Sequence, residues 1–337
     1  MLRDAFNRAI KDLRISVTDR CNFRCTYCMP LEEYVWINRS ELLTFEEIAR
    51  LAQLFVGLGV EKIRITGGEP LVRKDLHMLV GMLSGIQDVG DLCLTTNAAL
   101  LAEQIDDLAA AGLKRVNVSI DTLVPEKFKQ ITKRGDLDRV LEGLFAAKKR
   151  GLHPIKINAV IERGLNDDDI IPLVEFAREH GFSMRFIEYM DVGNANNWIS
   201  EKIVSKKEIV ETINTRFPLR EVGRGAGTAP SVDYEFVDGI GDVGVIASVT
   251  EPFCSSCTRA RLTADGKLVT CLFSNQGHDL KSLLRSGATD EQLVGVISSV
   301  WTKRTDRYSD ERLAAMNSPE GYQPKAHQKI EMITLGG

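Results

Sequence analysis

The 337-residue sequence has no long apolar run and only a small excess of acidic charge. No stretch approaches the roughly 20 consecutive apolar residues that a membrane-spanning helix needs. Met1–Ile10 alternates charged and apolar side chains and lacks the apolar core of a signal peptide, so we expect none. The net charge of −4 argues against the basic character of a non-specific nucleic-acid binder. These absences predict a cytoplasmic protein that binds neither membranes nor nucleic acid.

Cysteine is also scarce, with seven residues in the chain, but six of the seven fall in two groups. Disulfides are rare in the cytoplasm, so these cysteines are better interpreted as metal ligands. The first triplet, spaced Cys-x3-Cys-x2-Cys, comprises Cys21, Cys25 and Cys28. The second triplet, spaced Cys-x2-Cys-x13-Cys, comprises Cys254, Cys257 and Cys271.

Each triplet offers three thiolates where a four-iron cluster normally takes four. One iron of each cluster would therefore stay open to bind a second molecule. Two such clusters predict an enzyme that holds a cofactor at one cluster and a substrate at the other. The seventh cysteine, Cys93, lies between two leucines of a predicted strand and is expected to be buried.

The first two-thirds of the chain alternate strand patterns with helical patterns. Six strands are predicted, at Asp12–Asp19, Glu61–Gly68, Asp91–Asn97, Arg115–Asp121, Pro154–Ile161 and Ser183–Met190. Helices are predicted between them, at Thr44–Leu58, Leu101–Ala111, Leu137–Lys149 and Asp169–His180. This alternation predicts a parallel α/β sheet, and six repeats instead of eight predict an incomplete (β/α)6 TIM-type barrel.

The pattern changes after Ile199, and a boundary is expected near residue 220. Short antiparallel strands are predicted between Tyr234 and Phe273, with a turn at Asp265-Gly266, and helices between Leu280 and Lys303. Gly223–Gly227 is predicted to be a mobile loop. We therefore expect a partial barrel at residues 1–219 and a C-terminal α+β extension at 220–337, each carrying one cysteine triplet.

Several predicted strands sort their side chains onto an apolar and a polar face, because successive side chains point to opposite sides. The apolar face should lie under the helices, which leaves a polar and basic face toward the interior. A packed TIM barrel is instead filled with Val, Ile and Leu. The interior is therefore predicted to hold a large anionic ligand, although a solvated open sheet face remains an alternative. The basic residues on this side are Arg14, Lys62, Arg64, Lys156, Arg185, Arg259 and Arg261.

The first triplet follows the first strand directly, where α/β barrels place their chemistry. A zinc site is the alternative, but no fourth ligand is present before His77. The triplet carries Tyr27 before its last cysteine, and Gly67-Gly68-Glu69-Pro70 ends the second strand. Together these motifs resemble the radical S-adenosylmethionine superfamily. The resemblance implies that the open iron chelates S-adenosylmethionine and that an electron cleaves it to methionine and a 5′-deoxyadenosyl radical.

The second triplet is more ambiguous, because with His278 it could form a Cys3His zinc site. Arg259 and Arg261 lie between its ligands and would project to one side of an extended strand. A guanidinium binds phosphate oxygens bidentately, so this pair suggests recognition of a phosphate group beside an open cluster position.

Both triplets, Asp12-Leu13-Arg14 and the terminal Gly336-Gly337 resemble the MoaA-type GTP 3′,8-cyclase family of molybdenum cofactor biosynthesis. The resemblance covers nearly the whole chain. It implies two [4Fe-4S] clusters, S-adenosylmethionine as cofactor, and GTP held between the clusters. By position, the residues implied to contact S-adenosylmethionine are Tyr27, Gly68, Ser119 and Met190. Those implied to contact GTP are Arg14, Arg64, Thr95, Lys156, Arg259 and Arg261, with Thr96 as the alternative to Thr95.

The same resemblance implies conversion of GTP to (8S)-3′,8-cyclo-7,8-dihydroguanosine 5′-triphosphate, in a homodimer supplied by a small electron-donor protein. It also implies that the Gly336-Gly337 tail enters the active site. Two alternatives remain open from the residues. A radical peptide maturase would explain auxiliary clusters but not Arg259 and Arg261. A non-catalytic iron–sulfur or zinc scaffold would leave the open coordination sites without a purpose.

Overall fold

The computed structural model describes residues 1–336, and one large sheet organises them. Its strands are β1 Asp12–Ser16, β2 Lys62–Thr66, β3 Asp91–Thr96, β4 Arg115–Ser119, β5 Ile155–Ile161, β6 Ser183–Glu188, β7 Leu219–Gly223, β8 Val232–Phe236, β9 Asp242–Ile246, β10 Arg259–Leu262, β11 Lys267–Val269 and β12 His278–Asp279. Their order in the sheet is β12-β11-β10-β1-β2-β3-β4-β5-β6-β9-β8-β7. Neighbours from β1 to β6 are parallel, which confirms the predicted α/β class.

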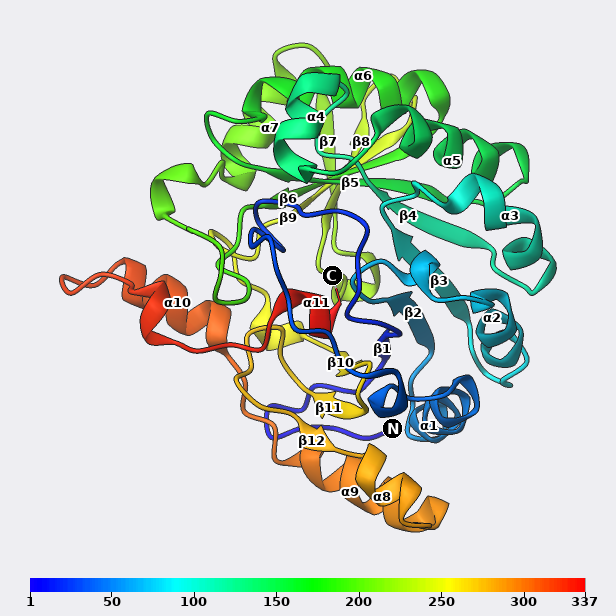
Figure 1. The fold of residues 1–337 in the computed structure, drawn as a ribbon. Helices are drawn as coiled ribbons and strands as arrows, with labels where there is room; N and C mark the ends of the chain where they lie inside the picture. The colour runs from blue at the N-terminus through cyan, green and yellow to red at the C-terminus, as the bar shows by residue number, and fades with distance from the viewer. Residues whose placement is uncertain (337) are drawn as a thin grey trace.

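Helices cover the outer side of this sheet (Figure 1). The longer helices are α1 Phe45–Gly57, α2 Leu76–Ser84, α3 Leu101–Ala110, α4 Pro125–Thr132, α5 Leu137–Lys149, α6 Ile170–His180, α7 Lys206–Asn214, α9 Asp290–Thr302 and α10 Tyr308–Met316. Two short ones are α8 Lys281–Arg285 and α11 Met332–Leu335. The sequence predicted α1, α3, α5 and α6 but not α2 and α4. α2 is apolar on most sides and shows no clear helical period. α4 does have one apolar side, with Phe128 and Ile131 buried, but it is only eight residues long and was missed.

Local signals set the ends of several helices. The Thr44 hydroxyl accepts from the Glu47 amide at 3.1 Å, and the Glu47 carboxylate accepts from the Thr44 amide at 2.8 Å. This capping box starts α1, and the same arrangement of Ser205 and Glu208 starts α7. Gly181 ends α6 in the left-handed region, with φ of 67°, where a side chain would be strained.

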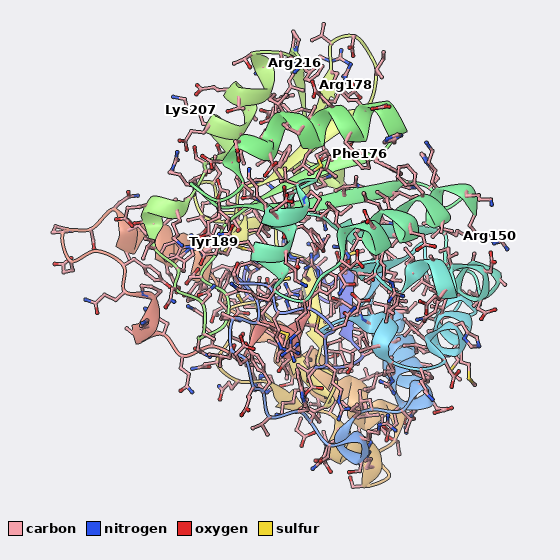
Figure 2. All side chains as sticks on the ribbon, turned by 45° about the horizontal axis from the view of Figure 1, so that its top comes forward. Arg150, Phe176, Arg178, Tyr189, Lys207 and Arg216 are labelled. Carbon is pink, nitrogen blue, oxygen red and sulfur yellow. The ribbon has the colours of Figure 1, made fainter. Side chains whose placement is uncertain are left out.

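The two faces of the strands separate as the alternation predicted. Leu13, Ile15, Ile63 and Ile65 are fully buried in the core between sheet and helices. Cys93 is also fully buried, as expected. Figure 2 shows the labelled Arg150 and Arg216 at the periphery, whereas Tyr189, which follows β6, is buried. The face away from the helices is therefore the one that can bind a ligand.

The C-terminal third extends this sheet at both of its edges. β10 pairs in parallel with β1, and β9 pairs in parallel with β6. The antiparallel pairs predicted for this region are present as β8 with β9 and β10 with β11, and Asp265-Gly266 lies in the turn between the latter two. Gly223–Gly227, expected to be a mobile loop, spans the end of β7 and a 3-10 turn. A division at residues 219 and 220 stays a prediction.

The last residues, Tyr308 to Gly336, form what we call the C-terminal strap. Figure 1 shows α11, at its end, on the inner side of the strand arc. Within the described residues 1–336, no helix has both the length and the apolar character to cross a membrane.

One buried carboxylate, that of Asp191, anchors the strap. It accepts from Lys329 Nζ at 2.9 Å and from the Tyr308 hydroxyl at 2.8 Å, and it pairs with Arg312. Burial alone would raise the pKa of Asp191, but Arg312 and Lys329 outweigh it and lower the pKa to about 2. The ionised carboxylate thus ties the strap to the loop after β6.

We predict that Asp191→Asn lowers the free energy of unfolding by about 3–5 kcal/mol at pH 7, because two buried cations lose their partner. Denaturant titration measures the loss. Because the folded pKa is lowered, the contribution of Asp191 is present above the unfolded pKa and disappears as pH falls toward 2. Asp238→Asn is the matched control, since Asp238 is half exposed in its pair with Arg178 and should change stability by less than about 1 kcal/mol. Equal losses in both variants would contradict the anchoring role.

Candidate functional site

A cavity of about 1790 Å³, including its open mouth, lies at the carboxyl ends of the parallel strands. All six cysteines of the two triplets line it. The strand ends contribute Thr66 to Glu69, Thr95 to Asn97, Ser119 and Asp121, and Met190. The predicted strands began within one residue of the observed ones but ran up to three residues too far. Several of the surplus residues leave the strand pairing and line the cavity.

The first triplet lies on the loop after β1, and backbone hydrogen bonds hold this loop against the end of α4. Arg24 N donates to Thr132 O at 2.9 Å, and Thr26 N donates to Ile131 O at 3.0 Å. Burial raises the pKa of Cys21 and of Cys28 to about 12, with a further increase from Glu69 at Cys21 and from Cys21 at Cys28. Burial also raises the pKa of Cys25 well above its usual range, and Asp121 and the other two thiols raise it further. Such thiols become ligands when a metal supplies the positive charge that stabilises a thiolate. Three soft sulfur donors on one buried loop fit an iron–sulfur cluster.

The loop after β2 approaches the first-triplet loop closely. Gly68 N donates to Thr18 O at 2.7 Å, and a Cβ at Gly68 would overlap Arg20 O and lie 2.8 Å from Asp19 O. The adjacent Glu69 is fully buried and accepts from Thr96 Oγ1 at 2.6 Å and from Asn97 N at 2.7 Å. Burial raises its pKa to about 7. Only glycine at position 68 allows this contact between the two loops.

The two neighbouring threonines of β3 have different surroundings. The Thr96 hydroxyl is engaged by Glu69, as described above. Thr95 Oγ1 is buried, lies at the cavity, and has no hydrogen-bond partner among residues 1–336. This difference favours Thr95 as the residue with a free hydroxyl for a ligand.

Tyr27, Ser119 and Met190 also line the cavity. The Tyr27 hydroxyl donates to Asp121 Oδ2 at 2.8 Å, and Val160 N donates to Asp121 Oδ1 at 2.8 Å. Burial raises the pKa of Asp121 to about 6. Asp121 was not among the predicted site residues, although its position just after the fourth strand could have indicated it.

The second triplet is divided between two short segments. Cys254 starts a 3-10 turn, Cys257 ends it, and Cys271 follows β11. Cys257 Sγ accepts from Arg259 Nη2 at 3.1 Å and from Arg304 Nη2 at 3.2 Å. Burial alone would raise the pKa of Cys257, but the charges of these two arginines outweigh it and lower the pKa to about 6. Arg304 was missed by sequence reasoning, because no motif surrounds it.

His278, the residue that a Cys3His zinc site would need, lies elsewhere. It is exposed on β12, where it pairs with Leu268 of β11. In the part of the chain that the structure describes, no three Cys, His, Asp or Glu side chains converge enough to hold one metal ion.

Three arginines lie side by side on adjacent strands. Arg14 of β1 is in register with Arg261 of β10 on one side and with Arg64 of β2 on the other. Burial lowers the pKa of Arg14 well below its usual range, and the charges of Arg261 and Arg64 lower it further. Arg14 Nε and Arg64 Nε are buried without a hydrogen-bond partner within the described residues. A row of buried, partly unpaired guanidinium groups is suited to a polyanion.

The cavity lining includes four of the predicted GTP contacts, Arg14, Thr95, Arg259 and Arg261. Arg64 and Lys156 are not among the described residues that line it. Each lies two residues before a cavity-lining residue of its strand, Thr66 and Asn158 respectively, and so on the same face. Lys62 pairs with Asp91 at 3.1 Å and Arg185 with Asp242 at 2.9 Å, so each of these two cations has a carboxylate partner.

Two family models match the sequence of this chain. The model described as Radical SAM superfamily matches residues 15–177, and the model described as Molybdenum Cofactor Synthesis C matches residues 182–310. The GTP 3′,8-cyclase of Acidothermus cellulolyticus is 47% identical over 360 residues, covering 100% of this chain and 99% of that protein. GTP 3′,8-cyclase 1 of Mycobacterium tuberculosis is 44% identical over 344 residues, covering 100% and 95%.

Among solved structures, Streptococcus suis SuiB bound to S-adenosylmethionine is similar with a TM-score of 0.61. The likeness covers 86% of this chain and 68% of that one, at 18% identity, and so concerns the fold alone.

The parallel sheet, the first triplet at its carboxyl edge and the matched family model define a radical S-adenosylmethionine enzyme. Membership of this superfamily implies one [4Fe-4S] cluster and S-adenosylmethionine. Within the superfamily the chain belongs to the GTP 3′,8-cyclase family, whose members it matches over its whole length at 41–47% identity.

Proposed function

We propose that this chain converts GTP to (8S)-3′,8-cyclo-7,8-dihydroguanosine 5′-triphosphate by 5′-deoxyadenosyl radical chemistry, the first step of molybdenum cofactor biosynthesis. The observation that carries the proposal is the single cavity onto which both cysteine triplets and the arginines of β1 and β10 open. The full-length similarity to GTP 3′,8-cyclases supports this proposal and favours it over the two alternatives, a peptide maturase and a non-catalytic scaffold.

In this proposal, β1 to β6 with their helices form an incomplete (β/α)6 barrel. Residues 220–337 form the extension that carries the second cluster and continues the sheet beyond β1 and β6. The pairing of β10 with β1 supports this arrangement, because it carries Arg259 and Arg261 to the strand that leads into the first triplet.

We assign Cys21, Cys25 and Cys28 to one [4Fe-4S] cluster and Cys254, Cys257 and Cys271 to a second. S-adenosylmethionine would contact Tyr27, Gly68, Ser119 and Met190, which all line the cavity on the side of the first triplet. When bound, the first cluster and S-adenosylmethionine supply the 5′-deoxyadenosyl radical that starts the reaction at ribose C3′ of GTP. Phe23 of this loop is buried and packs edge-on against Phe128, with 6.0 Å between the ring centroids, and it would shield the first cluster from water.

GTP would lie between the triplets, with its guanine toward the second one. The arginine row supplies positive charge for the triphosphate. The Thr95 hydroxyl has no hydrogen-bond partner among residues 1–336 and could bind GTP, whereas the Thr96 hydroxyl is already bound to Glu69. Arg64 and Lys156 would contact the part of GTP that passes beyond the cavity lining. Holding both ends of GTP fixes ribose C3′ near the radical and near guanine C8. Positioning of this kind can lower a barrier by on the order of 7–11 kcal/mol.

The test is an anaerobic assay in which the iron-reconstituted chain, S-adenosylmethionine and dithionite are incubated with GTP, with ATP or with neither. We expect release of 5′-deoxyadenosine to be strongly stimulated by GTP alone, with GTP consumed. Release that does not depend on nucleotide would keep the radical chemistry but refute GTP as substrate. Iron content of about eight per chain, without zinc, tests the two-cluster assignment independently.

Lys156 provides a pH-dependent test of GTP binding. Burial, together with the charges of Arg185 and Arg115, lowers the pKa of Lys156 to about 8. If its ammonium binds the triphosphate, the Kd for GTP should rise as pH increases from 7 to 9, approaching tenfold per pH unit above the pKa. Lys156→Arg stays charged over this range and should show a nearly flat profile. Titration calorimetry without reductant measures both, and parallel profiles would contradict the contact.

A homodimer and a small electron-donor protein stay predictions of the resemblance, and a cytoplasmic location stays a prediction from the sequence.

A further inference from the structure

A buried group of charged side chains lies behind the second triplet and joins the two ends of the chain. It consists of Asp4 and Arg8 near the amino terminus and Arg304 after α9. Their side chains are 0%, 2% and 1% exposed. Arg8 and Arg304 both line the cavity, yet neither belongs to a motif that the sequence analysis recognised.

Arg304 makes hydrogen bonds through all three nitrogens of its guanidinium. Nη2 donates to Cys257 Sγ at 3.2 Å, and Nη1 donates to Cys257 O at 2.8 Å and to Asp4 Oδ2 at 3.4 Å. Nε donates to Asp306 Oδ2 at 3.1 Å. The guanidinium also lies over the ring of Trp301, 4.7 Å from its centroid. These contacts fix one N–H group on the sulfur of Cys257.

Arg8 supports this arrangement from the other side. Its Nε donates to Asp4 Oδ2 at 2.5 Å, and its Nη1 donates to Cys254 O and to Asp306 O, each at 2.8 Å. Trp301 Nε1 donates to Arg8 O at 3.2 Å. Asp4 therefore lies between two arginines, and each arginine contacts the backbone of a cysteine of the second triplet.

The two triplets differ in the donors around their sulfur atoms. Cys257 accepts from two charged groups, Arg259 Nη2 and Arg304 Nη2. Cys21 of the first triplet accepts from neutral groups, Phe23 N at 3.4 Å and Asn97 Nδ2 at 3.9 Å. Hydrogen bonds to cluster sulfur and nearby positive charge stabilise the reduced, more negative state of a cluster.

We propose that Arg304 is a positioning residue that raises the reduction potential of the second cluster through its hydrogen bond to Cys257, and that Asp4 and Arg8 hold it in place. The inference rests on the proposed function, because it requires a cluster at the second triplet. It assigns a role to the amino-terminal segment, whose Asp4 and Arg8 hold Arg304 against the second triplet.

The experiment uses the full-length chain with Cys21, Cys25 and Cys28 replaced by serine, so that iron and spectroscopic signals come from the second triplet alone. About four irons per chain are expected. The midpoint potential is then measured by redox titration followed by electron paramagnetic resonance. Absence of iron from this parent chain would refute the proposed second cluster itself, which is a different result from an unchanged potential.

In this background Arg304→Met removes the charge and the donor, and we expect a lower midpoint potential at unchanged iron content. Arg304→Lys keeps the charge but loses the forked geometry of the guanidinium, so its midpoint potential should lie between that of the parent and that of Arg304→Met. Arg307→Met is the matched control, because Arg307 is half exposed and pairs with Asp310 at 3.0 Å. Its potential should equal that of the parent.

An Arg304→Met chain that binds iron fully and keeps the parent potential would overturn the proposal. If that variant fails to assemble its cluster, the midpoint potentials of Asp4→Asn and Arg304→Lys test the proposal instead, since both variants keep a donor at position 304. A lower potential in these two supports the role of Arg304, and the parent value in both overturns it.

Discussion

A Cys25→Ser chain is expected to release no 5′-deoxyadenosine above background and to consume no GTP. Cys25 is the central ligand of the first triplet, and burial raises the pKa of its thiol well above the usual range. A serine hydroxyl is a far poorer ligand for iron than a thiolate. Two remaining cysteines cannot hold a four-iron cluster that already lacks its fourth protein ligand. Nucleoside analysis after anaerobic reduction with dithionite measures the loss.

The matched control is Cys93→Ser, the same substitution at the fully buried cysteine of β3. It should lower the free energy of unfolding by no more than about 1–3 kcal/mol, because a more polar hydroxyl replaces a fully buried thiol that lies between Arg64 and Arg115 of the neighbouring strands. It should keep the 5′-deoxyadenosine yield per bound iron. The Cys25→Ser chain should retain about half of the iron, held by the second triplet. A parent-like yield of 5′-deoxyadenosine from Cys25→Ser would contradict the assignment of the first cluster.

Much of the site could be predicted because it depends on short-range patterns. Alternating side chains located the strands, and residues just beyond several strand ends line the cavity, Gly68 and Met190 among them. A parallel sheet brings such residues together whatever the details of packing, since all its strands end at one edge. The row formed by Arg14, Arg64 and Arg261 was harder to predict from the sequence, because the pairing of β10 with β1 joins strands almost 250 positions apart.

The group behind the second triplet could not be predicted for the same reason. Arg304 and Asp4 are 300 positions apart in the chain, and each looks like an ordinary surface charge in the sequence. Their burial follows only once α9 and the amino-terminal segment pack against the second-triplet loop. Sequence periodicity carries no information on such long-range pairing of charges.

Gly336→Ala should reduce cyclisation by on the order of 100-fold, as displacements near 1 Å can do, while sparing iron content and binding of S-adenosylmethionine. Gly336 O accepts from Arg261 Nη1 at 3.1 Å, which links the strap to a predicted GTP contact. Its φ is 72°, and an added Cβ would overlap Thr66 Cγ2 and lie 3.2 Å from Gly67 N. The methyl group would push the tail away from the end of β2. Product formation and S-adenosylmethionine binding are measured separately.

Gly321→Ala is the control for replacing a left-handed glycine of the strap. Gly321 lies in the same strap with φ of 69°, and a Cβ there would meet no atom of residues 1–336 within 4 Å. Gly336 combines φ of 72° with ψ of 141°, a region that only glycine populates readily, so Gly336→Ala carries about 1–3 kcal/mol of backbone strain in addition to the disturbed contact with β2. Deletion of Gly336 and Gly337, the second of which lies outside the described residues, should match Gly336→Ala. If Gly321→Ala were equally impaired, strain in the strap would explain the loss. If both variants kept full turnover, the tail would have no part in cyclisation, and its hydrogen bond to Arg261 would serve only to close the fold.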